Sequence, residues 1–292
     1  MVDRLPAWSL VLAGALSVQF GAAIAATLFD DLGPAAVTLL RLGFSAPILM
    51  LAWRPAVRGT PPGDLRLAAL FGLVLGGMNL SFYFALDRIP LGIAVTIEFA
   101  GPLAVGIIGS RRRVDVAFAL LAGCGIVLLA TAKGDGGPLD PLGLFFVSIA
   151  AACWAGYILL SQRVGQRFTG GRGLALGAMV SVLVPLVPGL IGGGGDLLDP
   201  RLLLAGLGVA LMSSVIPYSL DMQALRRLPT NVFGVLMSLE PALAALAGFL
   251  ILGQALGARE LVAIAFVVVA SVGVTRGAGD GPAPDLPVVP AG

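Results

Sequence analysis

The chain has 292 residues, of which 58% are hydrophobic and only 12% are charged, and its mean hydropathy is +1.00. A soluble globular domain carries roughly 25% charged residues, and a soluble chain of this length could not bury so much apolar surface. Histidine is absent and the net charge is +2, which excludes His-dependent catalysis and gives no electrostatic basis for binding nucleic acid. Lipid is therefore the expected solvent for most of the chain.

Ten apolar stretches are long enough to cross a bilayer, whose hydrocarbon core of about 30 Å requires roughly 20 helical residues. They are residues 8–29, 35–53, 67–86, 92–110, 114–132, 141–162, 174–191, 202–220, 230–252 and 260–274. The loops between them are too short to hold a soluble domain. Residues 277–292 are rich in Gly, Pro and Asp and are expected to form a disordered cytoplasmic tail.

The basic residues predict the orientation of these spans. If the N-terminus is cytoplasmic, 13 of the 18 Lys and Arg residues fall in cytoplasmic loops and ends, four fall outside, and Arg41 lies within a span. Cytoplasmic loops of membrane proteins are enriched in Lys and Arg. Both termini are therefore expected in the cytoplasm, which requires an even number of spans.

Two segments of the chain look alike and indicate an internal repeat. Residues 85–90 (ALDRIP) resemble residues 224–229 (ALRRLP), and a second proline follows each by twelve residues, at Pro102 and Pro241. The common offset of 139 residues relates the fourth span to the ninth. Since five spans separate them, the halves run in opposite directions across the membrane. The fold predicted is an all-α polytopic membrane protein with two inverted five-helix repeats, residues 1–136 and 137–276.

This architecture is typical of secondary transporters, which bind substrate near the midplane where the repeats meet. Pro102 and Pro241 lie inside spans, where each proline removes a backbone hydrogen bond and frees a carbonyl. We interpret both as hinges. The alternative is that they kink the helices only for packing, and the two interpretations are compatible.

Three charged residues lie deep within spans, namely Arg41, Glu98 and Glu240. Each costs about 2.5–3.5 kcal/mol at a helix centre, against a gain of about 0.3–0.6 kcal/mol for each Leu or Ile. They should therefore face the interior of the bundle. Arg41 and Glu98 either form a buried ion pair that fixes packing, or one of them contacts a zwitterionic substrate, or Glu98 carries protons. Glu240 either lines the cavity or caps free backbone.

Other polar and aromatic groups at mid-depth complete the candidate site. Many of them could simply bond a neighbouring helix, but a subset could bind a small polar solute: Gln19, Asn79, Tyr83, Trp154, Tyr157 and Tyr218. Trp154 is either a packing residue or a wall of the cavity. Asp221, at the inner end of its span, is expected at the membrane interface. Cys124 and Cys153 suggest neither a disulfide nor a zinc site, and no metal or cofactor is expected.

Several motifs resemble those of a known transporter family. They are GGMN (76–79), IPLGIAV (89–95), EFAGPLAV (98–105), ACWAGYIL (152–159), PYSL (217–220) and MSLEPALAA (237–245). In this order they are similar to bacterial exporters of threonine and homoserine, in the EamA branch of the drug/metabolite transporter superfamily. The resemblance implies ten helices in two inverted repeats, an inner-membrane location, and efflux of small neutral amino acids driven by proton entry.

The expected function is thus that of a secondary transporter and not of an enzyme. Its expected partners are a small amino-acid substrate, protons and membrane lipids, without nucleic acid, and it would work as a monomer or a homodimer. The alternative is an efflux carrier for other small metabolites or drugs. Only 3 Trp and 3 Tyr residues occur, which favours a small polar solute over the wide aromatic cavity of a multidrug carrier.

Overall fold

The structure is a computed structural model that describes residues 6–108, 113–130, 133–134, 137–225, 227–228 and 230–278. These residues are almost entirely helical. The strands among them are the two-residue β1 (Lys133–Gly134) and β2 (Gly137–Pro138), which pair antiparallel. The prediction of an all-α fold is confirmed. Most of the predicted tail lies outside the described residues, and the part that is described, 277–278, continues the last helix.

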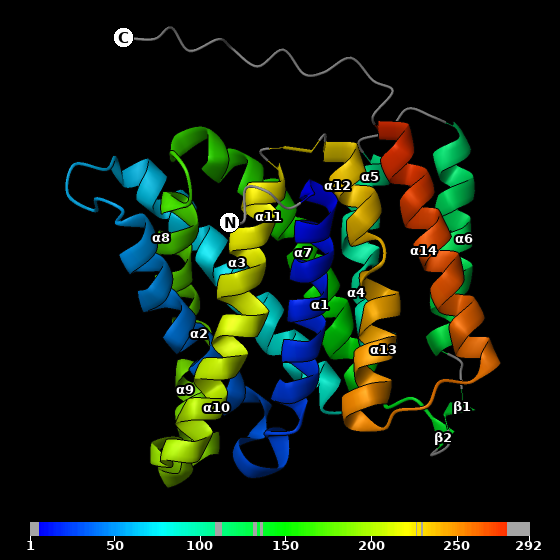
Figure 1. The fold of residues 1–292 in the computed structure, drawn as a ribbon, viewed down its shortest axis with the longest axis horizontal. Coiled ribbons are helices and arrows are strands. Elements are labelled where there is room, and N and C mark those ends of the chain that lie inside the picture. Colours follow the sequence, from blue (N-terminus) through cyan, green and yellow to red (C-terminus); the bar gives the residue numbers. More distant parts are fainter. Residues whose placement is uncertain are drawn as a thin grey trace, which may run out of the picture.

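The helices stand side by side with their ends on two opposite faces (Figure 1). In the first half they are α1 (Ala7–Ala26), α2 (Phe29–Trp53), α3 (Pro62–Leu86), α4 (Leu91–Glu98), α5 (Ala100–Ile108) and α6 (Arg113–Ala130). In the second half they are α7 (Pro141–Arg167), α8 (Arg172–Ser181), α9 (Leu183–Gly193), the 3-10 turn η2 (Gly194–Leu198), α10 (Pro200–Ala210), the π-helical turn η3 (Leu211–Val215), α11 (Ile216–Leu225), α12 (Thr230–Met237), α13 (Glu240–Leu252) and α14 (Ala258–Ala278).

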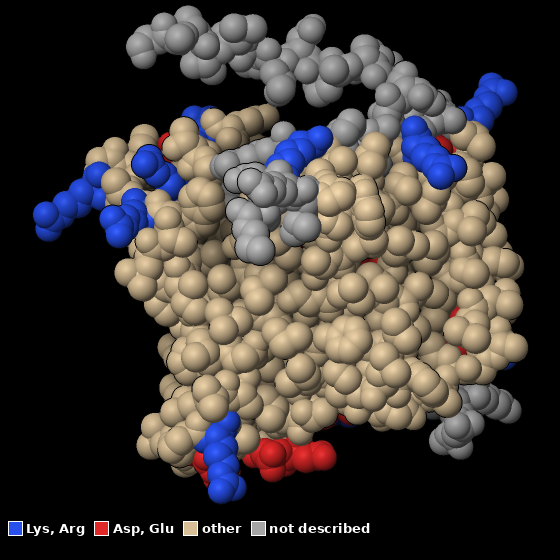
Figure 2. All heavy atoms as spheres, in the orientation of Figure 1, with Lys and Arg blue, Asp and Glu red and all other residues tan. Residues whose placement is uncertain are grey.

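Nine helical segments of the described residues are long and apolar enough to cross a membrane. Large apolar side chains point outward from several of them, such as Leu51, Ile108 and Ile191, which are 73%, 84% and 79% exposed. Figure 2 shows a broad belt nearly free of charge, with charged side chains gathered at the upper and lower ends. An outer surface of this kind requires lipid around it, so the chain is a multi-pass membrane protein.

The start of α2 shows how local sequence fixes the ends of a span. We expected this span to begin at residue 35, but the helix begins at Phe29 and bends at Gly33, whose φ of 74° leaves the helical region. Glycine adopts this conformation without steric cost, and Pro34, which follows it, is suited to the first position of a helix. The membrane-crossing part of α2 therefore starts one residue from the predicted boundary.

Glycines allow the helices to approach closely, as is common in membranes. A Cβ atom added at Gly72 of α3 would collide with the carbonyl oxygen of Gly177 in α8, and one at Gly76 would lie 2.6 Å from the carbonyl oxygen of Ser181. A Cβ at Gly101 of α5 would collide with the carbonyl oxygen of Ala151 in α7. These glycines hold α3 and α5 against the second half of the chain.

The loop between α3 and α4 is tied to the start of α7. Arg88 Nη1 lies 3.1 Å from Asp140 Oδ2, and Asp140 Oδ1 caps α7 by accepting a 2.8 Å hydrogen bond from the Leu142 backbone N–H. The Leu142 N–H and Arg88 together hold the pKa of the Asp140 carboxyl below its usual value. The two halves of the chain are thereby joined at one end of the bundle.

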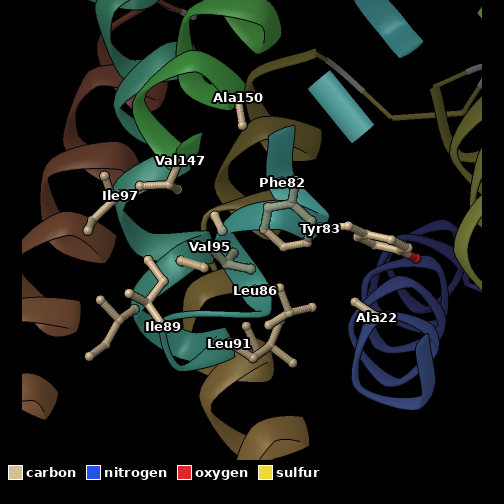
Figure 3. Close-up of a cluster of buried hydrophobic side chains, with 14 of the residues drawn as sticks. Ala22, Phe82, Tyr83, Leu86, Ile89, Leu91, Val95, Ile97, Val147 and Ala150 are labelled. Carbon is tan, nitrogen blue, oxygen red and sulfur yellow. The ribbon is translucent and has the colours of Figure 1, made fainter. Parts of the chain in front are cut away.

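The largest hydrophobic core lies where α3 and α4 meet α1 and α7. Tyr83, Val95 and Val147 are at most 2% exposed within it. Figure 3 shows the Tyr83 ring pointing from α3 toward Ala22 of α1, and its ring centroid lies 5.5 Å from that of Phe29. The core thereby brings a phenol hydroxyl deep into the bundle, next to the polar groups described below.

Replacing Gly72 with Ala should destabilise the protein, because the new methyl group meets the Gly177 carbonyl oxygen. Overpacking of this kind costs about 1–3 kcal/mol, more than the roughly 0.5–1 kcal/mol that Ala gains over Gly in a helix. The matched control is Gly123→Ala in α6, where a Cβ meets nothing within 4 Å. Thermal unfolding of the purified proteins should show a lower Tm for Gly72→Ala only. Equal Tm values would contradict the close α3–α8 contact.

Candidate functional site

A cluster of polar side chains lies inside the apolar bundle, contributed by six of its helical elements. Each member is at most 7% exposed: Gln19 (α1), Arg41 (α2), Asn79 (α3), Glu98 (α4), Ser213 and Ser214 (η3), and Glu240 (α13). All three charged residues that the sequence places within spans are among them. Their burial agrees with the expectation that such costly charges turn away from lipid.

Arg41 has the largest set of partners in this cluster. Its Nη2 donates to the Ser213 carbonyl oxygen at 2.8 Å, its Nε to Ser214 Oγ at 3.1 Å and its Nη1 to the Tyr83 hydroxyl at 3.2 Å. The guanidinium carbon lies 5.4 Å from the centroid of the Tyr83 ring, within range of a cation–π interaction. Hydrogen bonds to a charged group each contribute about 1.5–3 kcal/mol, so this network offsets much of the cost of burying the charge.

The π-helical turn η3 supplies the backbone acceptors for this network. The Ile216 N–H donates to the Leu211 carbonyl, five residues back, and Pro217 has no N–H to donate. The carbonyls of Met212 and Ser213 therefore lack their usual partners four residues ahead. Ser17 Oγ of α1 donates to the Met212 carbonyl at 2.7 Å, and Arg41 donates to that of Ser213. Turns of this type occur frequently at functional sites.

Glu98 does not form the ion pair with Arg41 that the sequence allowed. The two charges attract each other electrostatically, but within the described residues neither an ion pair nor a hydrogen bond joins them. The donors of Arg41 turn instead to Tyr83 and to the carbonyl that Pro217 leaves free. Glu98 is the last residue of α4 and is left with an uncommitted carboxylate.

Glu240 lies at the start of α13 and faces α1. Its Oε2 accepts a hydrogen bond from Gln19 Nε2 at 3.4 Å, a long one, and no side chain caps this helix. Electrostatic repulsion acts on Glu240 from Glu98 and Asp221. Of the two interpretations of Glu240, the geometry favours a side chain directed into the interior over one that caps the backbone.

Two of the helices break at the level of the acidic residues. The regular helix is interrupted by a turn at Phe99, between α4 and α5, and at Ser238 and Leu239, between α12 and α13, although the φ and ψ angles of Phe99 and Leu239 stay in the helical region. Pro102 and Pro241 lie in the first turn of the following helices. Each lacks the N–H that would bond the carbonyl four residues earlier, that of Glu98 or Met237. The role of the two prolines as hinges stays a prediction.

The remaining candidates have partners that serve packing. Asn79 Nδ2 donates to the Leu75 carbonyl of its own helix at 2.8 Å. Trp154 meets Phe99 edge to face, with 4.9 Å between ring centroids, and Tyr157 stacks on a phenylalanine of α3. Tyr218 packs against a small apolar cluster of α2 and α8. The structure thus joins Arg41 with Tyr83 and Gln19 with Glu240, but neither Asn79 nor Trp154 is bonded to these groups.

Two features of the site were not among the candidates predicted from sequence. The first is the pair Ser213 and Ser214, whose signal is the proline four residues after Ser213. The second is Asp221, which we expected at the interface, although its Oδ1 is fully buried. A carboxylate within a turn of a span's end does not reveal from sequence alone whether it points to water or to the interior.

A bundle of apolar helices with a buried cluster of charges beside broken helices defines a membrane transport protein. Known proteins agree: residues 141–276 match the EamA-like transporter family. Over 276 residues and 93% of both chains, the protein is 42% identical to the threonine/homoserine exporter RhtA of Salmonella typhimurium strain SL1344 and 41% identical to that of Escherichia coli K12. The chain therefore belongs to the EamA family, in the drug/metabolite transporter superfamily.

Two more distant proteins are also similar to this chain. Protein PecM of Dickeya dadantii is 27% identical over 215 residues, 69% of this chain and 70% of that protein. One solved crystal structure superposes with a TM-score of 0.62 at 19% identity, over 90% of this chain and 95% of the other, which shows a shared fold. Like its close relatives, the protein is a transporter and not an enzyme, and it resides in the inner membrane.

Ser214→Ala should destabilise the protein by about 1.5–3 kcal/mol, because the change removes a hydrogen bond to the buried Arg41 charge. The matched control is Ser219→Ala in α11, which directly continues η3. The Ser219 side chain is exposed, and its hydroxyl donates to the Val215 carbonyl one turn earlier. That change should stay within about 0.5 kcal/mol. Unfolding free energies of both variants in detergent micelles provide the measurement. A Ser214→Ala protein as stable as the wild type would mean that the hydrogen bond from Arg41 to Ser214 does not stabilise the fold.

Proposed function

We propose that the protein exports small neutral amino acids of the threonine and homoserine type across the inner membrane. The observation that carries this proposal is 41–42% identity over 93% of the chain to threonine/homoserine exporters of two bacteria. The alternative, export of other small metabolites or drugs of the same superfamily, is weaker because only 3 Trp and 3 Tyr residues occur, too few for the wide aromatic cavity of a multidrug carrier.

The charges of the site are complementary to a zwitterion. A guanidinium carries five N–H donors, and Arg41 uses three of them within the protein. The other two are available for the carboxylate of an amino acid, which arginine binds well in a planar arrangement. The uncommitted carboxylate of Glu98 would take the ammonium group. Tyr83 orients the guanidinium, and Gln19 orients Glu240.

We assign α6 as a tenth span, additional to the nine described above. It is an 18-residue helix with Arg113 and Asp115 only in its first turn, and it packs along α14. In Figure 1, α1 begins and α14 ends at the same end of the bundle, which requires an even number of crossings. Ten spans meet this requirement.

The packing of the helices supports two inverted repeats, residues 1–136 and 137–276. In the two repeats α1 corresponds to α7, α3 to α11 and α5 to α13. Exchanging the two halves therefore turns the α3–α7 contact into the α11–α1 contact, and the α5–α7 contact into the α13–α1 contact. The contacts of α2 with α9 and of α6 with α14 are converted into themselves. The breaks at Phe99 and at Ser238 and Leu239 also fall at corresponding places, since the offset of 139 residues relates Pro102 to Pro241.

Both termini are assigned to the cytoplasm from the bias of 13 basic residues against four. On the face drawn in Figure 2, more Lys and Arg side chains gather at the end where α1 begins than at the other end. The substrate would enter from this end, and rocking of one half against the other would then open the site to the outside. One chain supplies every group of the site, so a monomer suffices, and a homodimer would carry two independent sites.

Proton entry is the proposed driving force, with Glu98 and Glu240 as carriers. Two carboxylates that repel each other in an apolar interior favour uptake of a proton by one of them. A proton bound from the outside would displace the substrate's ammonium group from Glu98, and loss of this proton to the cytoplasm would restore the binding state. Export of one amino acid then accompanies the entry of at least one proton.

Glu98→Gln should abolish proton coupling, because the amide cannot exchange protons. We expect a pH gradient to stimulate threonine efflux from proteoliposomes at least about tenfold less than in the wild type. A tenfold change corresponds to a free-energy difference of about 1.4 kcal/mol. Glu260→Gln, at the start of α14 and away from the cluster, is the matched control and should behave as the wild type. Full stimulation in Glu98→Gln would show that Glu98 does not couple transport to protons.

A growth assay separates the proposed cargo from the alternative. A bacterium that expresses the protein should resist inhibitory concentrations of threonine and homoserine, but not dyes or antibiotics. Resistance confined to drugs, or to aromatic amino acids, would contradict the proposal. An Arg41→Lys variant with normal membrane expression should lose the resistance, since lysine cannot replace the planar guanidinium.

A further inference from the structure

Asp221 is a half-buried acid that has no role in the transport cycle proposed above. It ends the apolar segment Pro200–Asp221, where we expected it to face the lipid headgroups. Its Oδ1 atom is instead fully buried and has no hydrogen-bond partner among the described residues. A buried carboxylate oxygen without a partner destabilises the fold, so Asp221 is not explained as a structural residue.

The carboxylate of Asp221 turns toward α1, into a space left by a glycine. A Cβ atom added at Gly14 would lie only 3.0 Å from Asp221 Oδ1 and 3.7 Å from the Cα atom of Pro217. A side chain that pointed outward to the headgroups would not make this contact. Gly14 therefore provides the room in which the acid lies at the α1–α11 contact.

The titratable groups around Asp221 come from three elements. Glu240 of α13, Tyr157 of α7 and Tyr218 of α11 itself all interact with it electrostatically. The elements with the most contacts to α11 are α1, η3 and α12, and their described residues contain no titratable side chain. The helices α2 and α8 contact α11 at Tyr218, and Arg41 of α2 interacts electrostatically with that tyrosine. Arg227, beyond the end of α11, has a contact of its own. Asp221 is thus in electrostatic contact with the interior acid and lacks an ion pair among the described residues.

Asp221 is also the more accessible of the two interacting acids. Glu240 is 6% exposed, whereas Asp221 is only half-buried and lies at the end of its span. By the proposed topology this end is cytoplasmic, since α11 leads into the loop with Arg227. Asp221 therefore lies nearer than Glu240 to the cytoplasmic end of the bundle.

We propose that Asp221 is the proton acceptor on the cytoplasmic side of the transport cycle. The proton leaves the carboxylic acid of Glu240, binds the carboxylate of Asp221, and is then released to cytoplasmic water. Glu240 regains its negative charge, and no other bond changes. This inference rests on the proposed proton-coupled export. It adds a residue that acts in the proton path without contacting the amino acid.

The experiment compares two activities of one variant in proteoliposomes. Asp221→Asn should lose the stimulation of threonine efflux by a pH gradient, by at least about tenfold. Exchange of labelled for unlabelled threonine at equal pH should stay within about twofold of the wild type, because exchange needs no proton release. The matched control is Asp64→Asn on α3, an acid 3.8 Å from Arg167, which should preserve both activities.

Two results for Asp221→Asn would overturn the inference. Undiminished stimulation would mean that protons do not pass through Asp221. Loss of exchange together with stimulation in a correctly folded protein would mean that Asp221 binds substrate. If Asp221→Asn does not fold, Asp221→Glu takes its place. We expect Asp221→Glu to keep the stimulation of threonine efflux by a pH gradient. If Asp221→Glu exchanges threonine but shows no such stimulation, the proposal is contradicted. Lack of stimulation in the wild type would refute proton coupling itself and is thus a separate outcome.

Discussion

The buried guanidinium of Arg41 is the constraint on which the rest of the site depends. A charge that is 6% exposed inside a membrane bundle must be solvated by the protein. The chain meets this need with the Ser213 carbonyl that the π-helical turn and Pro217 leave free, with the Ser214 hydroxyl, and with the Tyr83 phenol of α3. Because Arg41 lies on α2 and its partners lie on α3 and η3, the charge also fixes how these three elements lie relative to one another.

The acids near Arg41 make the interior electrostatically unbalanced. Glu98, Glu240 and Asp221 interact with one another or with Arg41, and one guanidinium cannot neutralise three carboxylates. A protein in this situation binds protons, binds a cationic group of a substrate, or does both. An amino acid offers an ammonium group to an acid and a carboxylate to the arginine. The excess of carboxylates, which destabilises the protein without substrate, thereby provides both recognition of a zwitterion and coupling to protons.

The sequence predicts the course of the chain well, because lipid imposes strict length and polarity limits on each span. The positions of the helix breaks near Pro102 and Pro241 follow from the missing N–H of proline. The partners of Arg41 do not follow, since they depend on the rotation and depth of three helices packed against one another. An ion pair with Glu98 suits the sequence equally well, but in the structure the donors of Arg41 turn to Tyr83, Ser214 and the free carbonyl of Ser213.

The orientation of Asp221 was unpredictable for a related reason. Near the end of a span, a carboxylate can turn to water or inward at similar cost, and the outcome depends on the neighbour that it meets. Here the neighbour is Gly14, which has no side chain to exclude the carboxylate. Small residues on one helix thus decide the role of polar residues on another, a dependence that hydropathy and spacing do not reveal.

Binding of threonine to the purified protein tests the role of Arg41 most directly. Thermal unfolding in detergent, with and without threonine, should show stabilisation of the wild type and of Arg58→Lys, an exposed arginine outside the site. Arg41→Lys should fold but gain no stability from threonine, because its ammonium group cannot hold η3 and Tyr83 and also bind a carboxylate. Equal stabilisation of Arg41→Lys and the wild type by threonine would contradict a substrate site at Arg41.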